Sequence, residues 1–153
     1  MKNLMVNYGT LIKITRSLTK SKDPEEIIRM TVESIKSALG IKGCTLFLMN
    51  RQSKELEVAA SAGLSADYLN KGPISALHSI ADSLEDGPMA IYDVSDDPRI
   101  QYPEAAEKEG IASILSVPIM IGDEAIGAMR AYTAAKWEFT LDDVNFVQAL
   151  AQI

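Results

Sequence analysis

Residues 112–133 read ASILSVPIMI-GD-EAIGAMRAYT. Two apolar stretches, 112–121 and 124–133, flank the pair Gly122-Asp123. Glycine and aspartate tolerate the positive φ angles that tight hairpin turns require. The pattern therefore predicts an antiparallel hairpin, formed by the longest apolar strand pair in the chain.

Two amphipathic segments, one before and one after this hairpin, predict helices over 24–39 and 140–153. Asp23 and the proline after it make a strong helix start, because the carboxylate accepts from free amides and proline fits the first turn. Thr140 begins the second helix, with Asp143 three residues later as in a capping box. Both helices carry one apolar stripe, so both are expected to bury it on the same face of a sheet.

The other predicted elements complete one α/β domain of the α+β type. Strands are expected at 42–49, 55–58 and 89–94, a loop at 63–72, and shorter helices at 74–86 and 103–109. Because hairpins dominate this order, the predicted fold is a single central, mainly antiparallel sheet with helices on both faces. The two shorter helices are expected to cover the face opposite the two main helices.

The composition indicates one globular domain. The chain has 153 residues, of which 47% are hydrophobic and 24% are charged. No apolar run approaches the ~20 residues needed to cross a bilayer, and the first ten residues lack the apolar stretch of a signal peptide. We therefore expect a cytoplasmic protein without a membrane span. The net charge of −6 repels phosphate backbones and so disfavours direct binding to nucleic acid.

Residues 1–22 differ from the rest because they contain five basic residues and no acidic residue. A helix with one apolar stripe is predicted there from the heptad-like spacing of Leu4, Leu11, Ile14 and Leu18. We therefore divide the chain into an N-terminal dimerisation or linker helix, 1–22, and a main domain, 23–153. The alternative is that the stripe packs on the domain's own body. Because the chain ends inside the predicted last helix, we expect it to be a fragment of a longer protein.

The order of these elements resembles the GAF domain, and so do four motifs. They are Gly63-Leu64, the DVSDDPR stretch at 93–99, SILSVPI at 113–119 followed by IGAM at 126–129, and FTLDD at 139–143. The resemblance implies a sensory, regulatory module that lies upstream of an effector domain in a signalling protein. Many members bind a small molecule in a pocket beside the sheet, and many form homodimers through terminal helices.

The resemblance also allows family subtypes to be compared. Cyclic-nucleotide-binding members match at Phe139 and Asp143, but Val144 replaces their glutamate. Members that bind a bilin attach it through a cysteine near the pocket helices, whereas Cys44, the only cysteine, lies in a predicted strand. Methionine-sulfoxide-reducing members need a second, resolving thiol, which this chain lacks. We therefore expect no cofactor and no enzymatic activity, although a spatial pair of Cys44 with the only histidine remains open.

A candidate ligand site follows from the resemblance and from the polar residues near the predicted cleft. The cleft is expected between helix 74–86, loop 93–102 and the hairpin, with an apolar wall of Leu77, Ile80, Ala81 and either Ile114 or Leu115. Its polar groups would be His78, Asp93, Arg99, Tyr102 and Arg130. Two of these five are permanent cations, and a cation beside an apolar wall favours a small anionic ligand.

Each candidate residue also has a simpler explanation. His78 can be a packing residue, and Asp93 can cap a turn or neutralise Arg99. A metal site at the neighbouring aspartates is not expected, because their spacing differs from that of a calcium loop. A buried Arg130 needs an anionic partner, which is either a ligand or an acid of the protein such as Glu104 or Glu107. The second function that we consider is therefore a ligand-free dimerisation or interaction module with a collapsed pocket.

Removal of residues 1–20 is expected to weaken self-association, because it removes most of the predicted apolar stripe. Light scattering on chains with and without these residues measures the effect. A dimer mass for the whole chain that falls after truncation is the expected result. A monomer mass for both chains would rule out the dimer.

Overall fold

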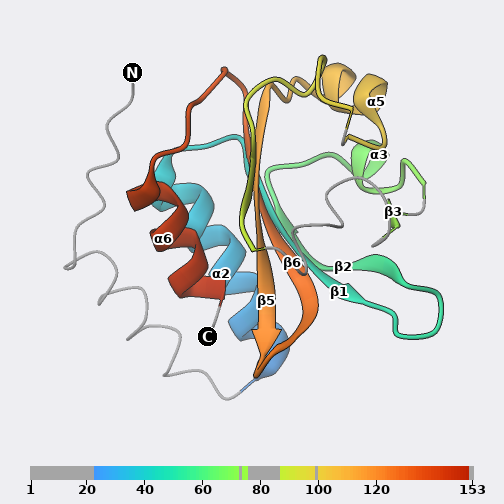
Figure 1. Ribbon diagram of the computed structural model, residues 1–153, viewed down its shortest axis with the longest axis vertical. Coiled ribbons are helices and arrows are strands. Elements are labelled where there is room, and N and C mark those ends of the chain that lie inside the picture. The colour runs from blue at the N-terminus through green and yellow to red at the C-terminus, as the bar shows by residue number, and fades with distance from the viewer. Residues whose placement is uncertain (1–22, 73, 76–86, 99, 152–153) are drawn as a thin grey trace.

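The computed structural model describes residues 23–72, 74–75, 87–98 and 100–151. The predicted N-terminal helix, 1–22, lies outside the described residues, and so does most of the predicted helix 74–86. The described residues form one sheet with helices on both of its faces, which confirms the predicted α/β fold class (Figure 1).

The sheet has six strands in the order β3-β2-β1-β6-β5-β4, and every neighbouring pair is antiparallel. Its strands are β1 (Gly43–Met49), β2 (Glu55–Ala62), β3 (Ile74–Ser75), β4 (Met89–Ile91), β5 (Ser113–Ile121) and β6 (Glu124–Thr133). The predicted hairpin is confirmed as β5 and β6, which are joined by Gly122 at a φ of 60°. Strand β6 also pairs with β1, so the hairpin lies in the middle of the sheet.

One face of the sheet is covered by the two main helices, α2 (Pro24–Leu39) and α6 (Leu141–Ala151), which lie side by side in Figure 1. Alternate residues of the central strands point to this face, including Leu115, Met129 and Ala131. They pack with the apolar stripes of both helices in one hydrophobic core. The prediction that these two helices share a face is therefore confirmed.

The opposite face carries two short helices, α3 (Ala66–Leu69) and α5 (Pro103–Glu109). A second apolar cluster lies there, with Tyr68 from α3, Ala106 from α5, and Ile114 and Tyr132 from the sheet. We call this surface of the sheet the α3/α5 face.

Several local predictions were wrong, including the strand expected at 89–94, which ends at Ile91. Ile74–Ser75 is not the start of a helix, because it pairs with Glu55 and Leu56 of β2 as the edge strand β3. The predicted loop 63–72 contains helix α3, because the Ser65 hydroxyl accepts a hydrogen bond from the Tyr68 amide and so caps a helical turn. Strand β2 also continues four residues beyond its predicted end.

The capping box that begins α6 is confirmed in atomic detail. The Thr140 amide donates to the Asp143 carboxylate at 2.9 Å, and the Asp143 amide donates to the Thr140 hydroxyl at 3.2 Å. The same carboxylate accepts from the Trp137 indole nitrogen at 3.2 Å, although Asp143 is only 2% exposed. Asp143 therefore connects the β6–α6 loop to the helix that covers the sheet.

Replacing Asp143 by alanine is expected to destabilise the domain by about 2 kcal/mol, because the Thr140 amide and the Trp137 indole nitrogen both lose their acceptor. Urea unfolding measures the loss. Asp142→Ala is the matched control, since Asp142 is exposed in the same turn and is expected to cost about 0.5 kcal/mol. Equal losses in the two variants would contradict the role assigned to Asp143.

Candidate functional site

A row of polar side chains crosses the α3/α5 face from strand to strand. Ser61 of β2 lies opposite Thr45 of β1, which lies opposite Arg130 of β6, which in turn lies opposite Ser116 of β5. Three of the four are buried, and Arg130 is only 4% exposed. The outer pair is satisfied, because the Thr45 and Ser61 hydroxyls are 2.9 Å apart. This row places one guanidinium in the middle of a buried surface.

The Arg130 guanidinium has no ionic partner among the described residues. Its Nε and Nη2 atoms are buried and make no hydrogen bond in this part of the chain. Its central carbon lies 4.9 Å from the centre of the Phe47 ring, a cation–π contact that replaces only part of the lost hydration. Glu104 and Glu107, which the sequence offered as partners, are exposed on α5 and form no ion pair with Arg130.

Tyr132 is the next β6 residue on the same face, and it is completely buried. Its hydroxyl has no hydrogen-bond partner of good geometry among the described residues. Burial raises the pKa of this phenol, and the positive charge of Arg130 partly offsets that effect. Its ring packs edge-on against Tyr68, with 5.9 Å between the ring centres. Two neighbouring β6 side chains therefore hold unsatisfied polar atoms on one buried surface.

Lys71 brings a second cation to this region from the loop after α3. Its ammonium lies 3.8 Å from the centre of the Tyr68 ring and donates to the Tyr68 carbonyl oxygen at 3.1 Å. Burial and the nearby charge of Arg130 lower the pKa of Lys71 to about 8, while Glu109 opposes this shift. The shift indicates that the two cations influence one another electrostatically.

Arg130, Lys71 and Tyr68 line a small cavity of about 10 Å³. That volume holds roughly one water molecule. Its lining consists of Tyr68, Lys71, Ile100, Gln101, Tyr102, Ile114 and Arg130. Among these described residues there are two cations and no carboxylate. We call this set the Arg130 cavity.

The structure brings together some of the predicted site residues and separates others. Tyr102 and Arg130 both line the Arg130 cavity, and Ile114 rather than Leu115 forms its apolar wall, because Leu115 points to the α2/α6 face. Asp93 does not line the cavity. His78 and Arg99 lie outside the described residues.

Asp93 has partners of its own. Its carboxylate accepts from the Ser95 amide at 3.0 Å and from the Ser95 hydroxyl at 2.6 Å, and it lies 3.2 Å from the Lys136 ammonium. The hydrogen bonds from Ser95, followed by the bond from Lys136, lower the pKa of Asp93. Asp93 therefore caps its own turn, the simpler of the two roles considered for it.

Three residues at or beside the cavity, Tyr68, Lys71 and Tyr132, were not predicted. Tyr68 and Lys71 fall in the segment that was interpreted as loop, where no apolar periodicity indicates which way a side chain points. Ser65 was the available signal, because a serine three residues before Tyr68 is a typical helix cap. Tyr132 is two residues after Arg130 in the same strand, so both side chains point to the same face of the sheet. A prediction of the face for one residue is therefore also a prediction for the other.

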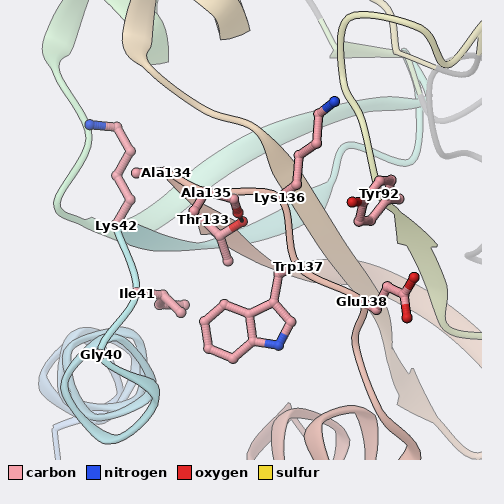
Figure 2. A pocket seen from close by; sticks show the side chains of 10 residues that line it. All are labelled: Gly40, Ile41, Lys42, Tyr92, Thr133, Ala134, Ala135, Lys136, Trp137 and Glu138. Carbon is pink, nitrogen blue, oxygen red and sulfur yellow. Dashed lines mark hydrogen bonds between the residues drawn. The ribbon is translucent and has the colours of Figure 1, made fainter. Parts of the chain in front are cut away.

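A larger cleft of about 510 Å³ lies where β6 leads into α6 (Figure 2). Figure 2 shows the Trp137 ring near Ile41, with the Lys42 and Lys136 side chains extending away from it. Two of its polar side chains have partners, since the Trp137 indole donates to Asp143 and the Thr133 hydroxyl donates to the Ala135 carbonyl at 2.7 Å. Among the described residues, the buried polar atoms without a hydrogen bond belong to Arg130 and Tyr132, and neither residue lines this cleft.

Cys44 lies on the α2/α6 face, where its sulfur is 3.7 Å from that of Met129. It is fully buried, and burial raises the pKa of its thiol far above the usual range. Within the described residues, no three His, Cys, Asp or Glu side chains gather as metal ligands. None of the described helices is long and apolar enough to cross a membrane.

Arg130→Met is expected to raise the stability of the ligand-free domain by about 1–3 kcal/mol, because it replaces an unpaired buried cation with an apolar chain of similar length. Urea unfolding gives the difference in free energy. Arg29→Met is the control, since Arg29 forms only an exposed pair with Glu33 and is expected to change stability by about 0.5 kcal/mol or less. A clear loss of stability in Arg130→Met would mean that the guanidinium has an internal partner.

Comparison with solved structures shows that the fold is a known one. The GAF domain of a phosphoenolpyruvate-protein phosphotransferase from Coxiella burnetii aligns with a TM-score of 0.85 and 21% identity, covering 99% of this chain and 91% of that one. The corresponding GAF domain from Acinetobacter gives 0.80 and 16%, covering 99% and 90%. Free methionine-R-sulfoxide reductase from Neisseria meningitidis, in complex with its substrate, gives 0.80 and 19%, covering 99% and 91%.

Sequence comparison identifies the family. No curated protein matches the chain. The sequence model of the GAF domain, however, matches residues 23–153, which include every described helix and strand. With the fold seen in these structures, this match shows that the chain belongs to the GAF domain family.

Proposed function

We propose that this domain senses a small molecule that binds on the α3/α5 face at the Arg130 cavity. GAF domains form a family of sensory and regulatory modules in signalling proteins. The observation that carries the proposal is the buried Arg130 guanidinium, whose Nε and Nη2 atoms have no partner among the described residues.

The energetic cost of this arrangement supports a ligand. Burying a charge without a partner costs several kcal/mol, and domains of this size have a total stability of only about 5–15 kcal/mol. A ligand that pairs with Arg130 offsets this cost in the bound state. The cavity holds roughly one water molecule, so the residues around it must move apart when a ligand enters.

The sheet offers a route from the cavity to the terminal helix. Arg130 faces the cavity, while its neighbours in β6, Met129 and Ala131, pack into the core beneath α2 and α6. A ligand that shifts β6 therefore changes the surface on which α6 rests. We propose that this change reaches an effector domain in a longer protein, and that the domain acts as a homodimer.

We also propose that the domain has no catalytic activity of its own. Cys44 points away from the cavity and its burial disfavours the thiolate, which is the reactive form. A single cysteine also lacks the resolving thiol that a reductase cycle needs. Reduction of free methionine sulfoxide that is lost in Cys44→Ser would contradict this proposal.

The small volume of the cavity favours a second candidate function. A ligand-free dimerisation or interaction module needs no room beside the sheet, and about 10 Å³ is available among the described residues. In that case Arg130 would be retained only for the packing of its alkyl chain and its contact with Phe47.

Native mass spectrometry on gently purified protein tests the two functions. Wild type is expected to carry a bound small molecule, and Arg130→Met is expected to lose it. Arg29→Met is the control and is expected to keep it, because Arg29 lies on the outer surface of α2. If all three proteins carry nothing, and a mixed panel of neutral and charged metabolites shifts no melting temperature, the ligand-free module is the better account.

A further inference from the structure

The two unpartnered nitrogens of Arg130 belong to one edge of its guanidinium. The N–H bond of Nε and the nearer N–H bond of Nη2 point in parallel from that edge. Two parallel donors at this spacing match the two oxygens of a carboxylate or phosphoryl group. Both nitrogens are buried and without a hydrogen bond among the described residues. The free edge therefore has the shape of an oxyanion receptor.

The surroundings of Lys71 strengthen the preference for an anion. Among the described residues, the titratable groups that act on it are Arg130 from β6, Tyr68 from α3, Tyr102 from the segment before α5, and Glu109 from α5. Of these only Glu109 is acidic, and its two oxygens accept from the Ser65 amide at 2.7 Å and the Ser65 hydroxyl at 2.6 Å. The described residues that line the cavity therefore include two cations, Lys71 and Arg130, and no carboxylate.

Resting on the proposed function, we infer that the ligand carries a carboxylate or phosphoryl group that binds side-on to Nε and Nη2 of Arg130. Lys71 supplies the second positive charge for this group. The buried Tyr132 hydroxyl, which has no hydrogen-bond partner of good geometry among the described residues, is a third donor beside it. The receptor therefore consists of the planar guanidinium of Arg130 and the phenol of Tyr132, both from β6, and the ammonium of Lys71 from the loop after α3.

A pH dependence follows from the second charge. The ligand-free pKa of Lys71 is about 8, so the ammonium is charged at pH 7 and largely neutral at pH 9.5. A bound anion raises this pKa, and affinity is therefore full below about 8 and falls as the pH rises above that value. If the anion raises the pKa by about one unit, the loss of affinity is about tenfold. Arg130 stays charged throughout, so binding is weakened and not abolished.

The test uses two probes whose own charge is constant over this pH range, succinate for the carboxylate source and sulfate for the phosphoryl source. Each is titrated at pH 7.0 and 9.5, with sodium chloride holding the ionic strength constant. Isothermal titration calorimetry measures the affinity of every protein at both pH values, and the side-chain Nε–H signal of Arg130 in a nitrogen–proton NMR spectrum at pH 7.0 reports binding at the fork in the proteins that retain this arginine. Dimethyl succinate is the uncharged control. The probe that binds more tightly identifies the source of the oxyanion.

The variants separate the contributions of the three groups. Arg130→Lys keeps a positive charge but loses the two parallel N–H donors of Nε and Nη2. It is expected to weaken binding at least about tenfold. Lys71→Met is expected to remove the pH dependence. Lys136→Met is the matched control and is expected to change neither, because that lysine pairs with Asp93 away from the cavity. If Arg130→Lys does not fold, Tyr132→Phe replaces it and is expected to weaken binding by a few-fold.

The inference fails if neither anion moves the Arg130 signal, if Arg130→Lys binds as well as wild type, or if Lys71→Met keeps the pH dependence. The proposed function is judged separately by native mass spectrometry. A neutral ligand that is bound there and lost in Arg130→Met would preserve the proposed function and overturn this inference. If no protein carries a ligand, no metabolite of the panel shifts a melting temperature and neither anion moves the Arg130 signal, both the proposed function and this inference are overturned.

Discussion

The register of β6 between β1 and β5 is the constraint on which the rest of this structure depends. In this register Arg130 faces α3 and α5, while Met129 and Ala131 face α2 and α6. A slip by one residue would place the guanidinium in the apolar core beneath the helices. Gly127 helps to fix the register, because a Cβ atom at this position would come within 2.1 Å of the Phe47 carbonyl oxygen.

The two faces of the sheet therefore have different chemistry. The α2/α6 face is an apolar core that stabilises the domain and buries the only cysteine. The α3/α5 face mixes apolar packing with a buried polar row, which contains one cation that has no ionic partner among the described residues. The apolar core and the proposed ligand site therefore lie on opposite sides of the same strands, and a substitution at one β6 position is expected to affect one without the other.

The sequence predicted most of the fold because periodic patterns and caps are local signals. The hairpin, the helix starting at Pro24 and the capping box at Asp143 all follow from a few adjacent residues. The candidate site was less predictable. Nothing local indicates that Lys71 lies over Tyr68, or that Arg130 has no acidic partner in the part of the chain that the structure describes, because both depend on segments that return to the sheet from distant positions. Asp93 was separated from Arg130 for the same reason, since its partners are Ser95 and Lys136.

A crystal structure of the whole chain, purified without dialysis, would show which group binds to Nε and Nη2 of Arg130. The account predicts the two oxygens of a small-molecule oxyanion at about 2.7–2.9 Å from Nε and Nη2. A carboxylate of the protein's own chain at that edge would contradict the account, since the guanidinium would then be an internal ion pair.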